Sequence, residues 1–279
     1  MSDDQGITKM TASQDSMAPE GISPGSPVDR TGESVPTLEL KGITKRFGGV
    51  VASEDVSLEV HSGEVVALVG NNGAGKSTIL RIISGAQVPD AGEIRLEGKH
   101  VRLKSVHAAR EHGIEAVPQE LAMAPKLDVV TNIFLGREIT HGPRWLGFLA
   151  GRKMGREAKT LVETLGAHIP HMRAKVGTLS GGQRQATAIA RAVGWGRSVV
   201  VLDEPTAALG VHETAQVEKS IRHMKDMGLS ILLVSHDMDQ VFRVANRVYV
   251  LYHGRVVAEE RPLSSTRERV VSLITSGDE

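Results

Sequence analysis

The sequence predicts an α/β protein with a mixed or parallel core sheet, an antiparallel β layer and an inserted helical subdomain. Apolar runs at residues 65–69, 199–202 and 231–234 are typical of strands that are buried on both faces of a sheet. The first two runs are each followed by a segment with the apolar spacing of a helix. The first also leads into a glycine-rich loop that ends in Lys76 and Ser77.

The composition suits one large globular domain or two small ones. Of the 279 residues, 40% are hydrophobic and 24% are charged. There are 33 basic residues (lysine plus arginine) and 33 acidic residues (aspartate plus glutamate), so the formal net charge is zero. The overall charge therefore gives no reason to expect binding to nucleic acid or to an anionic membrane. Cysteine is absent, which excludes disulfides and thiol chemistry and fits a cytosolic protein. The apolar runs are far shorter than the ~20 residues of a spanning helix, so any membrane role requires a partner.

Residues 1–35 are expected to form a disordered tail, and one ordered domain is expected over residues 36–279. The tail is rich in Ser, Pro, Gly and Asp and lacks the apolar centre of a secretory signal. Order is expected to begin with strands at residues 37–40 and 56–60. Phe47 is assigned to a polar, glycine-flanked loop between them. An aromatic side chain there either stacks on a nucleotide base or packs in the core, and the residues alone favour neither.

Residues 70–77, GNNGAGKS, fit the phosphate-binding pattern G-x-x-x-x-G-K-[ST] between a predicted strand and a predicted helix. This context favours a phosphate site over a flexible glycine-rich loop. The glycines let backbone N–H groups turn toward a polyphosphate, and the helix N-terminus adds partial positive charge. Lys76 is expected to reach the β- and γ-phosphates, and the Ser77 hydroxyl to hold Mg²⁺. The predicted nucleotide-binding residues here are Gly70, Asn71, Asn72, Gly73, Ala74, Gly75, Lys76, Ser77 and Thr78.

The middle of the chain changes from strands to helices. An alternating strand and turn at residues 92–99 extend the antiparallel layer, and a helix at 106–112 precedes a strand at 114–117. From residue 121 the spacing is helical, so we interpret residues 121–182, approximately, as an inserted helical subdomain. The clearest helix of this block carries one apolar stripe: Met154, Ala158, Leu161, Val162 and Leu165.

The last third of the chain returns to the α/β pattern. One helix is predicted to open at residues 179–183, with a buried face of Ala186, Ile189, Ala190 and Val193. A second helix is predicted to end at Gly228, with a buried face of Val217, Ile221 and Met224. A hairpin around residues 253–254 and a helix over 267–274 are expected to close the chain.

Polar residues follow two of the predicted buried strands. Asp203 and Glu204 end one strand, and His236 follows the other. The carboxyl ends of parallel strands are where α/β sheets bind ligands. Paired carboxylates here can instead cap the next helix, and a lone histidine is more often structural. The phosphate loop upstream favours the ligand-binding interpretation.

Five motifs together resemble those of the ATPase subunit of an ATP-binding cassette (ABC) transporter. In order, they are the phosphate loop, Gln119, residues 179–183 (LSGGQ), residues 199–204 and residues 235–236. They are similar to the Walker A, Q-loop, signature, Walker B and switch-histidine motifs, and the resemblance runs from about residue 37 to the end. It implies the P-loop NTPase fold of the ABC ATPases, with ATP and Mg²⁺ as cofactors.

The resemblance also implies a role for each matching residue. Glu204 would polarise the attacking water, and Asp203 would hold Mg²⁺ through water. Gln119 would meet both the metal and that water, and His236 would contact the γ-phosphate. The implied catalytic residues are Glu204, His236, Gln119 and Lys76, and the implied metal ligands are Ser77, Gln119 and Asp203.

In this family the signature residues approach the ATP of a second subunit, so that two chains enclose two nucleotides. The implied residues are Ser180, Gly181, Gly182 and Gln183. Phe47 matches the family's base-stacking aromatic position, which favours the stacking interpretation. One residue departs from the family: the loop after Walker B commonly ends in S-A-L-D, whereas Leu209 is followed here by Gly210. Communication between subunits through that position is therefore in doubt.

A finer resemblance links residues 117–121 and 132–138 to cassettes that power bacterial import of monosaccharides such as ribose, xylose or fructose. It implies an ATPase that works as a homodimer, or pairs with another cassette. Its partners would be transmembrane permease subunits and a solute-binding protein, at the cytoplasmic face of the inner membrane. Residues 132–138 and the Gln119 loop are expected to dock the permease.

Two other function classes are weighed against this one. A non-transport cassette ATPase acting on nucleic acid or ribosomes usually carries coiled-coil insertions or basic arms, and neither is visible in the sequence. A binding module with inactive chemistry is disfavoured by the intact Lys76, Asp203, Glu204 and His236.

Overall fold

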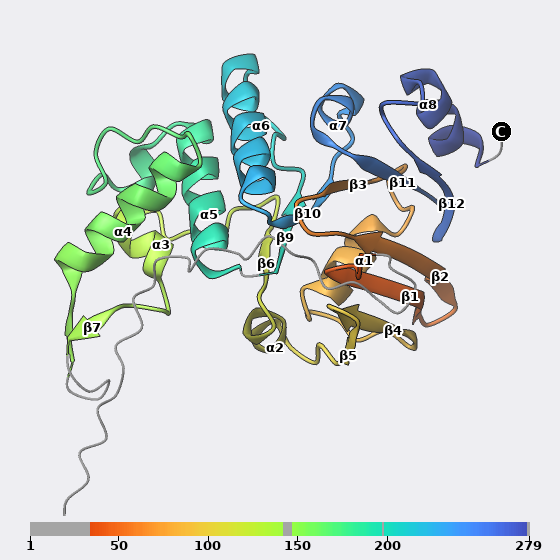
Figure 1. The fold of residues 1–279 in the computed structure, drawn as a ribbon, viewed down its shortest axis with the longest axis horizontal. Coiled ribbons are helices and arrows are strands. Elements are labelled where there is room, and N and C mark those ends of the chain that lie inside the picture. Colours follow the sequence, from red (N-terminus) through yellow and green to blue (C-terminus); the bar gives the residue numbers. More distant parts are fainter. Residues whose placement is uncertain (1–33, 142–146, 197, 278–279) are drawn as a thin grey trace, which may run out of the picture.

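The computed structural model describes residues 34–141, 147–196 and 198–277. The expected disordered tail therefore lies outside the described residues, apart from residues 34 and 35. Figure 1 shows the main sheet near the centre, strands β1, β2, β4 and β5 to one side, and helices α3, α4 and α5 to the other.

A six-stranded sheet, ordered β12–β11–β3–β10–β9–β6, forms the centre. Five of its strands are parallel to one another, and β12 pairs antiparallel with β11. The strands are β3 (Val65–Val69), β6 (Ile114–Val117), β9 (Val199–Asp203), β10 (Ser230–Val234), β11 (Arg247–Tyr252) and β12 (Arg255–Glu260). All residues of β3 and β10 are buried, as the continuous apolar runs predict. The expected mixed core sheet is confirmed.

A second, antiparallel sheet has the order β2–β1–β4–β5. Its strands are β1 (Leu38–Phe47), β2 (Val50–Val60), β4 (Ala91–Leu96) and β5 (Lys99–Val101). Its buried side chains join those of α1 (Lys76–Ile83) and one face of the central sheet in a single apolar cluster. The phosphate loop is therefore held between two sheets.

One assignment in this sheet is wrong. Residues 45–47 are the end of β1 and not part of a loop, because Lys45, Arg46 and Phe47 pair with Ser53, Val51 and Val50 of β2. Only Gly48 and Gly49 form the turn, with Gly48 in the left-handed region at φ 57°. The outer end of this hairpin is mostly exposed, so it lacks the apolar alternation that reveals a strand.

The helical block contains α3 (Val129–Phe134), α4 (Gly151–Thr164), a short 3₁₀ turn at Val176–Thr178 and α5 (Gly181–Trp195). The apolar stripe predicted for α4 is buried at Met154, Ala158 and Val162. A small hairpin of β7 (Thr140–His141) and β8 (Phe148–Leu149) was not predicted. One continuous apolar cluster joins α3, α4 and α5 to α6 and the central sheet.

Among the described residues, four further helices complete the fold: α2 (Val106–Glu111), α6 (Val211–Asp226), α7 (Met238–Val244) and α8 (Arg267–Ser276). The predicted buried face of α6, at Val217, Ile221 and Met224, is confirmed. Helix α7 was not predicted; it is one of the shorter helices and is N-capped by Asp237, whose side chain accepts from the Gln240 N–H. Helices α7 and α8 cover the β3–β11 part of the sheet through a third apolar cluster.

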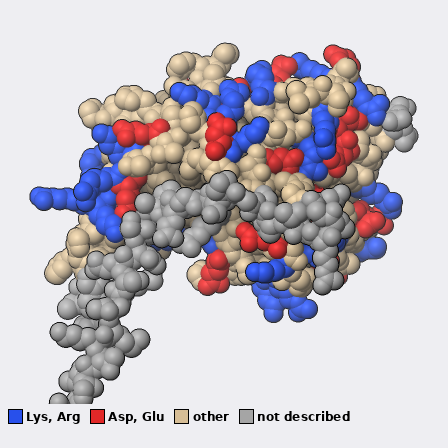
Figure 2. Space-filling view, in the orientation of Figure 1, with Lys and Arg blue, Asp and Glu red and all other residues tan. Residues whose placement is uncertain are grey.

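Charged side chains of both signs are interspersed over the face in Figure 2, in keeping with the equal numbers of acidic and basic residues. Within the described ranges, no helix combines the length and apolar character needed to cross a membrane.

Candidate active site

The phosphate loop is fixed by close approach of its glycines to neighbouring strands. Gly70 and Gly75 adopt φ angles of 154° and 105°. A Cβ on Gly70 would lie 2.2 Å from the Leu251 carbonyl oxygen, and one on Gly75 would lie 2.4 Å from that of Ala52. Any larger residue would force the loop away from β11 or β2. These two glycines are therefore needed for both backbone angle and space.

The loop wraps around the ammonium group of Lys76. Its Nζ donates to the carbonyl oxygens of Gly70, at 2.7 Å, and Asn71, at 3.0 Å. Burial lowers the pKa of Lys76 below its usual value, while the charges of Glu204 and Asp203 act in the opposite direction. No side chain caps α1, so its N-terminal amides keep their partial positive charge for a ligand.

A cavity of about 260 Å³ brings three of the sequence motifs together. Phosphate-loop residues line it, among them Lys76, Ser77 and Thr78, together with Gln119, Asp203 and Glu204. Strand β3 leads into the phosphate loop, and strands β6 and β9 lead to Gln119 and to the two carboxylates. The cavity therefore lies at the carboxyl edge of the central sheet, the usual ligand position in this architecture.

The two carboxylates differ in their surroundings. Asp203 ends β9 and is half-buried; desolvation and the charge of Glu204 raise its pKa, whereas Lys76 and Arg81 lower it. Glu204 has a left-handed backbone at φ 47°, and its N–H donates to the Val234 carbonyl at 2.9 Å. Such a conformation is uncommon for a non-glycine residue and is held here by the neighbouring strand.

His236 contacts Glu204 directly. Its Nδ1 lies 2.7 Å from the Glu204 Oε2. The His236 backbone N–H donates to the same oxygen at 3.4 Å. The Glu204 side chain is 15% exposed and the His236 side chain 74%, so the histidine is the more exposed member of the pair. The structure thus joins the end of β10 to the end of β9.

The predicted signature residues and Phe47 do not line this cavity. Ser180 caps α5: its Oγ accepts from the Gln183 N–H, and the Gln183 side chain accepts from the Ser180 N–H. Phe47 is 44% exposed at the end of β1, so it is not a core residue. Beside the signature residues lies a residue that the sequence analysis missed: Glu213 of α6 accepts a hydrogen bond from the Gly182 N–H.

Gly210 precedes α6 with an extended backbone, at φ −73° and ψ 167°. No other heavy atom of the described residues lies within 4 Å of a Cβ built on it. Neither backbone angle nor space therefore requires glycine at this position.

The residues present fit a magnesium ion that is held largely by its nucleotide. Among the described residues, no cluster of three or more His, Cys, Asp or Glu side chains is placed to hold a metal by itself. Mg²⁺ commonly takes one or two protein oxygen ligands and completes its shell with phosphates and water. The Ser77 hydroxyl and the Asp203 carboxylate, both at the cavity, are oxygen donors of this kind.

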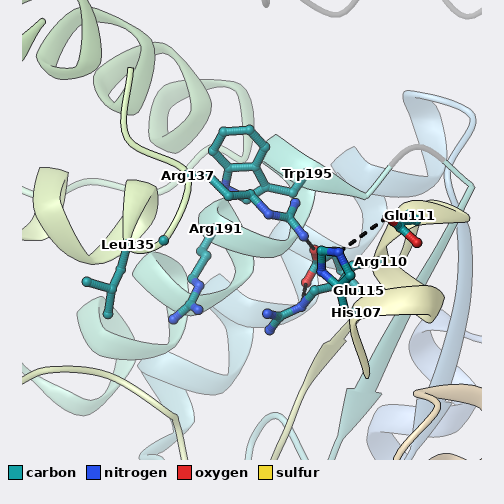
Figure 3. Close-up of a pocket in the computed structure, with 9 residues that line it drawn as sticks. His107, Arg110, Glu111, Glu115, Leu135, Arg137, Arg191 and Trp195 are labelled. Carbon is teal, nitrogen blue, oxygen red and sulfur yellow. Dashed lines mark hydrogen bonds and ion pairs between the residues drawn. The ribbon is translucent and has the colours of Figure 1, made fainter. Parts of the chain in front are cut away.

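A second cavity, of about 370 Å³, lies between α2, the segment after α3, and α5 (Figure 3). Its buried Glu115 carboxylate lies 2.6 Å from Arg137 and 3.4 Å from Arg110. The Arg137 guanidinium also lies 4.9 Å from the ring centroid of Trp195. The pKa of Arg191 is lowered mainly by burial and, to a smaller extent, by the charge of Arg110. The Arg191 Nη1 donates to the Ala122 carbonyl oxygen.

Comparison with known proteins identifies a family. The ABC transporter family matches residues 53–207. The chain is 44% identical to the xylose/arabinose import ATP-binding protein of Sulfolobus acidocaldarius, over 86% of this chain and 94% of that protein. It is 42% identical to the fructose import ATP-binding protein of Rhizobium meliloti, over 88% and 95%. A ribose import ATP-binding protein of Rubrobacter xylanophilus is 43% identical over 80% of this chain, which spans only 44% of that longer protein.

Solved structures agree in fold. A nucleotide-free ATP-binding cassette from an ABC transporter gives a TM-score of 0.72 at 26% identity, over 85% of this chain and 95% of that one. A dimeric cassette in a post-hydrolysis state with ADP and Pi gives 0.67 at 25% identity, over 81% and 98%. The P-loop ABC ATPase fold implied by the sequence motifs is confirmed. The chain belongs to the ABC transporter family, as one of its ATP-hydrolysing cassettes.

Proposed function

We propose that this cassette binds ATP with Mg²⁺ in the cavity at the carboxyl edge of the central sheet and uses its hydrolysis to drive monosaccharide import. The observation that carries the proposal is the convergence of the phosphate loop, Gln119, Asp203 and Glu204 on one cavity. The sugar is supported by relatives named as xylose/arabinose and fructose import proteins, which this chain matches over nearly their whole length.

The chain's own residues suit phosphoryl transfer by positioning and charge. The Lys76 ammonium is partnered by two backbone carbonyls, and an anionic phosphate is a stronger partner for it. Ser77 and Asp203 would hold Mg²⁺, which neutralises charge on the phosphates. Gln119 lines the same cavity and would contact both metal and water.

Glu204 is the proposed general base. Glu204 lines the cavity, its side chain is largely shielded from solvent, and its Oε2 lies 2.7 Å from the His236 Nδ1. A carboxylate held this way can orient a water molecule and accept its proton. His236 would keep that orientation and, being the exposed member of the pair, would reach the γ-phosphate.

The cassette would act as a homodimer in the ATP-bound state, with permease subunits and a solute-binding protein as partners. It would sit peripherally at the cytoplasmic face of the inner membrane. One structural neighbour is a dimeric cassette with ADP and Pi. A cassette acting on nucleic acid or ribosomes is not favoured, because the matching relatives are named import proteins.

Residues 132–138 and the Gln119 loop are the proposed permease-docking segment. Leu135 and Arg137 from this segment line the cavity of Figure 3. Arg137 is a poor probe of docking, because reversing its charge would place a carboxylate against the buried Glu115. Leu135 is better suited: it is 37% exposed, and Val271 of α8, at 42%, is a control outside both the cavity and the docking segment.

The test is sugar uptake into vesicles that contain this cassette with its permease and solute-binding protein, with ATP and Mg²⁺ on the cassette side. We expect uptake of xylose, arabinose, fructose or ribose. Leu135→Glu should abolish uptake but leave the ATPase rate of the isolated cassette unchanged, and Val271→Glu should leave both unchanged. Uptake of none of these sugars by the wild type contradicts the proposed substrate class. Equal losses in both variants contradict the docking surface.

A further inference from the structure

Glu213 joins the beginnings of two helices. It lies in the first turn of α6, and its Oε1 accepts from the Gly182 N–H of α5 at 3.0 Å. Its Oε2 accepts from the Gly210 N–H at 3.3 Å. These two backbone hydrogen bonds, and then one from the Ser180 side chain, lower the pKa of Glu213 below its usual value. The carboxylate is therefore ionised at neutral pH.

The start of α5 lies close to the side chains of Glu213 and of Leu209, which precedes α6. A Cβ on Gly182 would lie 3.1 Å from the Cβ and Cγ atoms of Glu213. A Cβ on Gly181 would lie 2.8 Å from the Leu209 Cδ2. The two signature glycines thus allow Glu213 to reach the first amides of α5.

The N-terminus of α5 therefore already holds an anion. The Gln183 N–H donates to the Ser180 Oγ, and the Gly182 N–H donates to Glu213. Under the proposed function, Ser180 and Gly182 would instead face the phosphates of ATP bound to a second cassette. A carboxylate and a phosphate compete for the same donors at a helix N-terminus, and their like charges repel.

We propose that Glu213 is an internal anion that occupies the signature donors until the second cassette's ATP displaces it, and so sets the ATP concentration at which two cassettes close. The proposal rests on the proposed role of Ser180 and Gly182. Because the same carboxylate holds Gly210, its release also frees the end of the loop that begins at Glu204. In a chain without an Asp at position 210, Glu213 is a charged side chain that links this loop to the signature helix through backbone hydrogen bonds.

A purely structural role is the alternative. A glutamate at the third position of a helix commonly accepts from the N-cap amide, as Glu213 does from Gly210. Glu213→Gln separates the two roles, because glutamine keeps the size and one acceptor oxygen but loses the charge. Glu268, in the first turn of α8, gives the matched control Glu268→Gln.

The experiment measures ATP-driven dimerisation of the full chain by light scattering, with Glu204→Gln as the background in every sample to prevent turnover. We expect Glu213→Gln to lower the ATP concentration at half-maximal dimerisation by about three- to tenfold, the scale of one lost hydrogen bond. Glu213→Asp, whose shorter side chain cannot bridge both amides, should shift it in the same direction. Glu268→Gln should not shift it.

An unchanged or higher ATP midpoint in Glu213→Gln, with unaltered thermal unfolding, would overturn the proposal. If Glu213→Gln fails to fold, the same criterion applies to Glu213→Asp. Ser180→Ala distinguishes this failure from that of the proposed function. If Ser180→Ala raises the midpoint while the Glu213 variants do not lower it, only the Glu213 proposal fails. If neither residue affects dimerisation, the proposed role of the signature residues fails as well.

Discussion

At the scale of single residues, the candidate site combines a cation that favours an anionic ligand with a carboxylate that is held in a fixed orientation. Lys76 is buried with two carbonyl oxygens as partners, and Glu204 is held in a left-handed backbone beside His236. Phe47 is the predicted site residue whose secondary structure differs from the expectation. It belongs to a strand and not to a loop, and its exposure leaves the ring accessible to a base.

If Phe47 stacks on adenine, Phe47→Ala should weaken ATP binding by ~1 kcal/mol or somewhat more, as the loss of one aromatic stack implies. Phe47→Tyr and Phe47→Trp should restore affinity, because both keep a planar aromatic face. Isothermal titration with a non-hydrolysable ATP analogue measures this. Unchanged affinity combined with a lower unfolding temperature would instead assign Phe47 to hairpin packing.

Among the elements, those determined by local sequence could be predicted, and those determined by tertiary contact could not. The strand–loop–helix around Lys76 and the start of α5 near Ser180 depend on neighbouring residues, so the motifs indicate them correctly. The contact between Gly182 and Glu213 joins residues 31 positions apart. The pairing of Phe47 with Val50 depends on an exposed hairpin with little apolar patterning.

The surroundings of Gly210, at the start of α6, leave room for a side chain. Its φ of −73° and the open space around it mean that an Asp fits without strain. Gly210→Asp should therefore fold, and should stabilise α6 by a few tenths of a kcal/mol, roughly the difference between Asp and Gly at an N-cap. If an Asp there reaches the opposite phosphate loop, the Hill coefficient for ATP should rise.

Thermal unfolding and the ATP dependence of turnover in the assembled transporter measure these two effects. The weak coupling expected of Gly210 would be refuted by a wild-type Hill coefficient near two that the substitution leaves unchanged.

At the scale of the whole molecule, one continuous apolar cluster joins the helical block to the central sheet. Strand β6 carries Glu115, at the cavity of Figure 3, and leads to Gln119 at the proposed nucleotide site. A permease bound at the cavity of Figure 3 would thus act on a strand that leads to the proposed nucleotide site. The charged network of Glu115 with Arg110 and Arg137 is a tertiary arrangement that no local motif predicts.

The assignment of this cavity as the hydrolytic site is tested most directly by the turnover of Glu204→Gln at saturating ATP and Mg²⁺. The substitution removes proton acceptance by the carboxylate but spares the phosphate loop and Lys76. Turnover should therefore fall by about 10²-fold or more, the usual contribution of a general base, while ATP affinity is retained. The variant should accumulate as an ATP-bound dimer in gel filtration. Turnover at the wild-type rate, with normal ATP binding, would contradict the assignment of this cavity as the hydrolytic site.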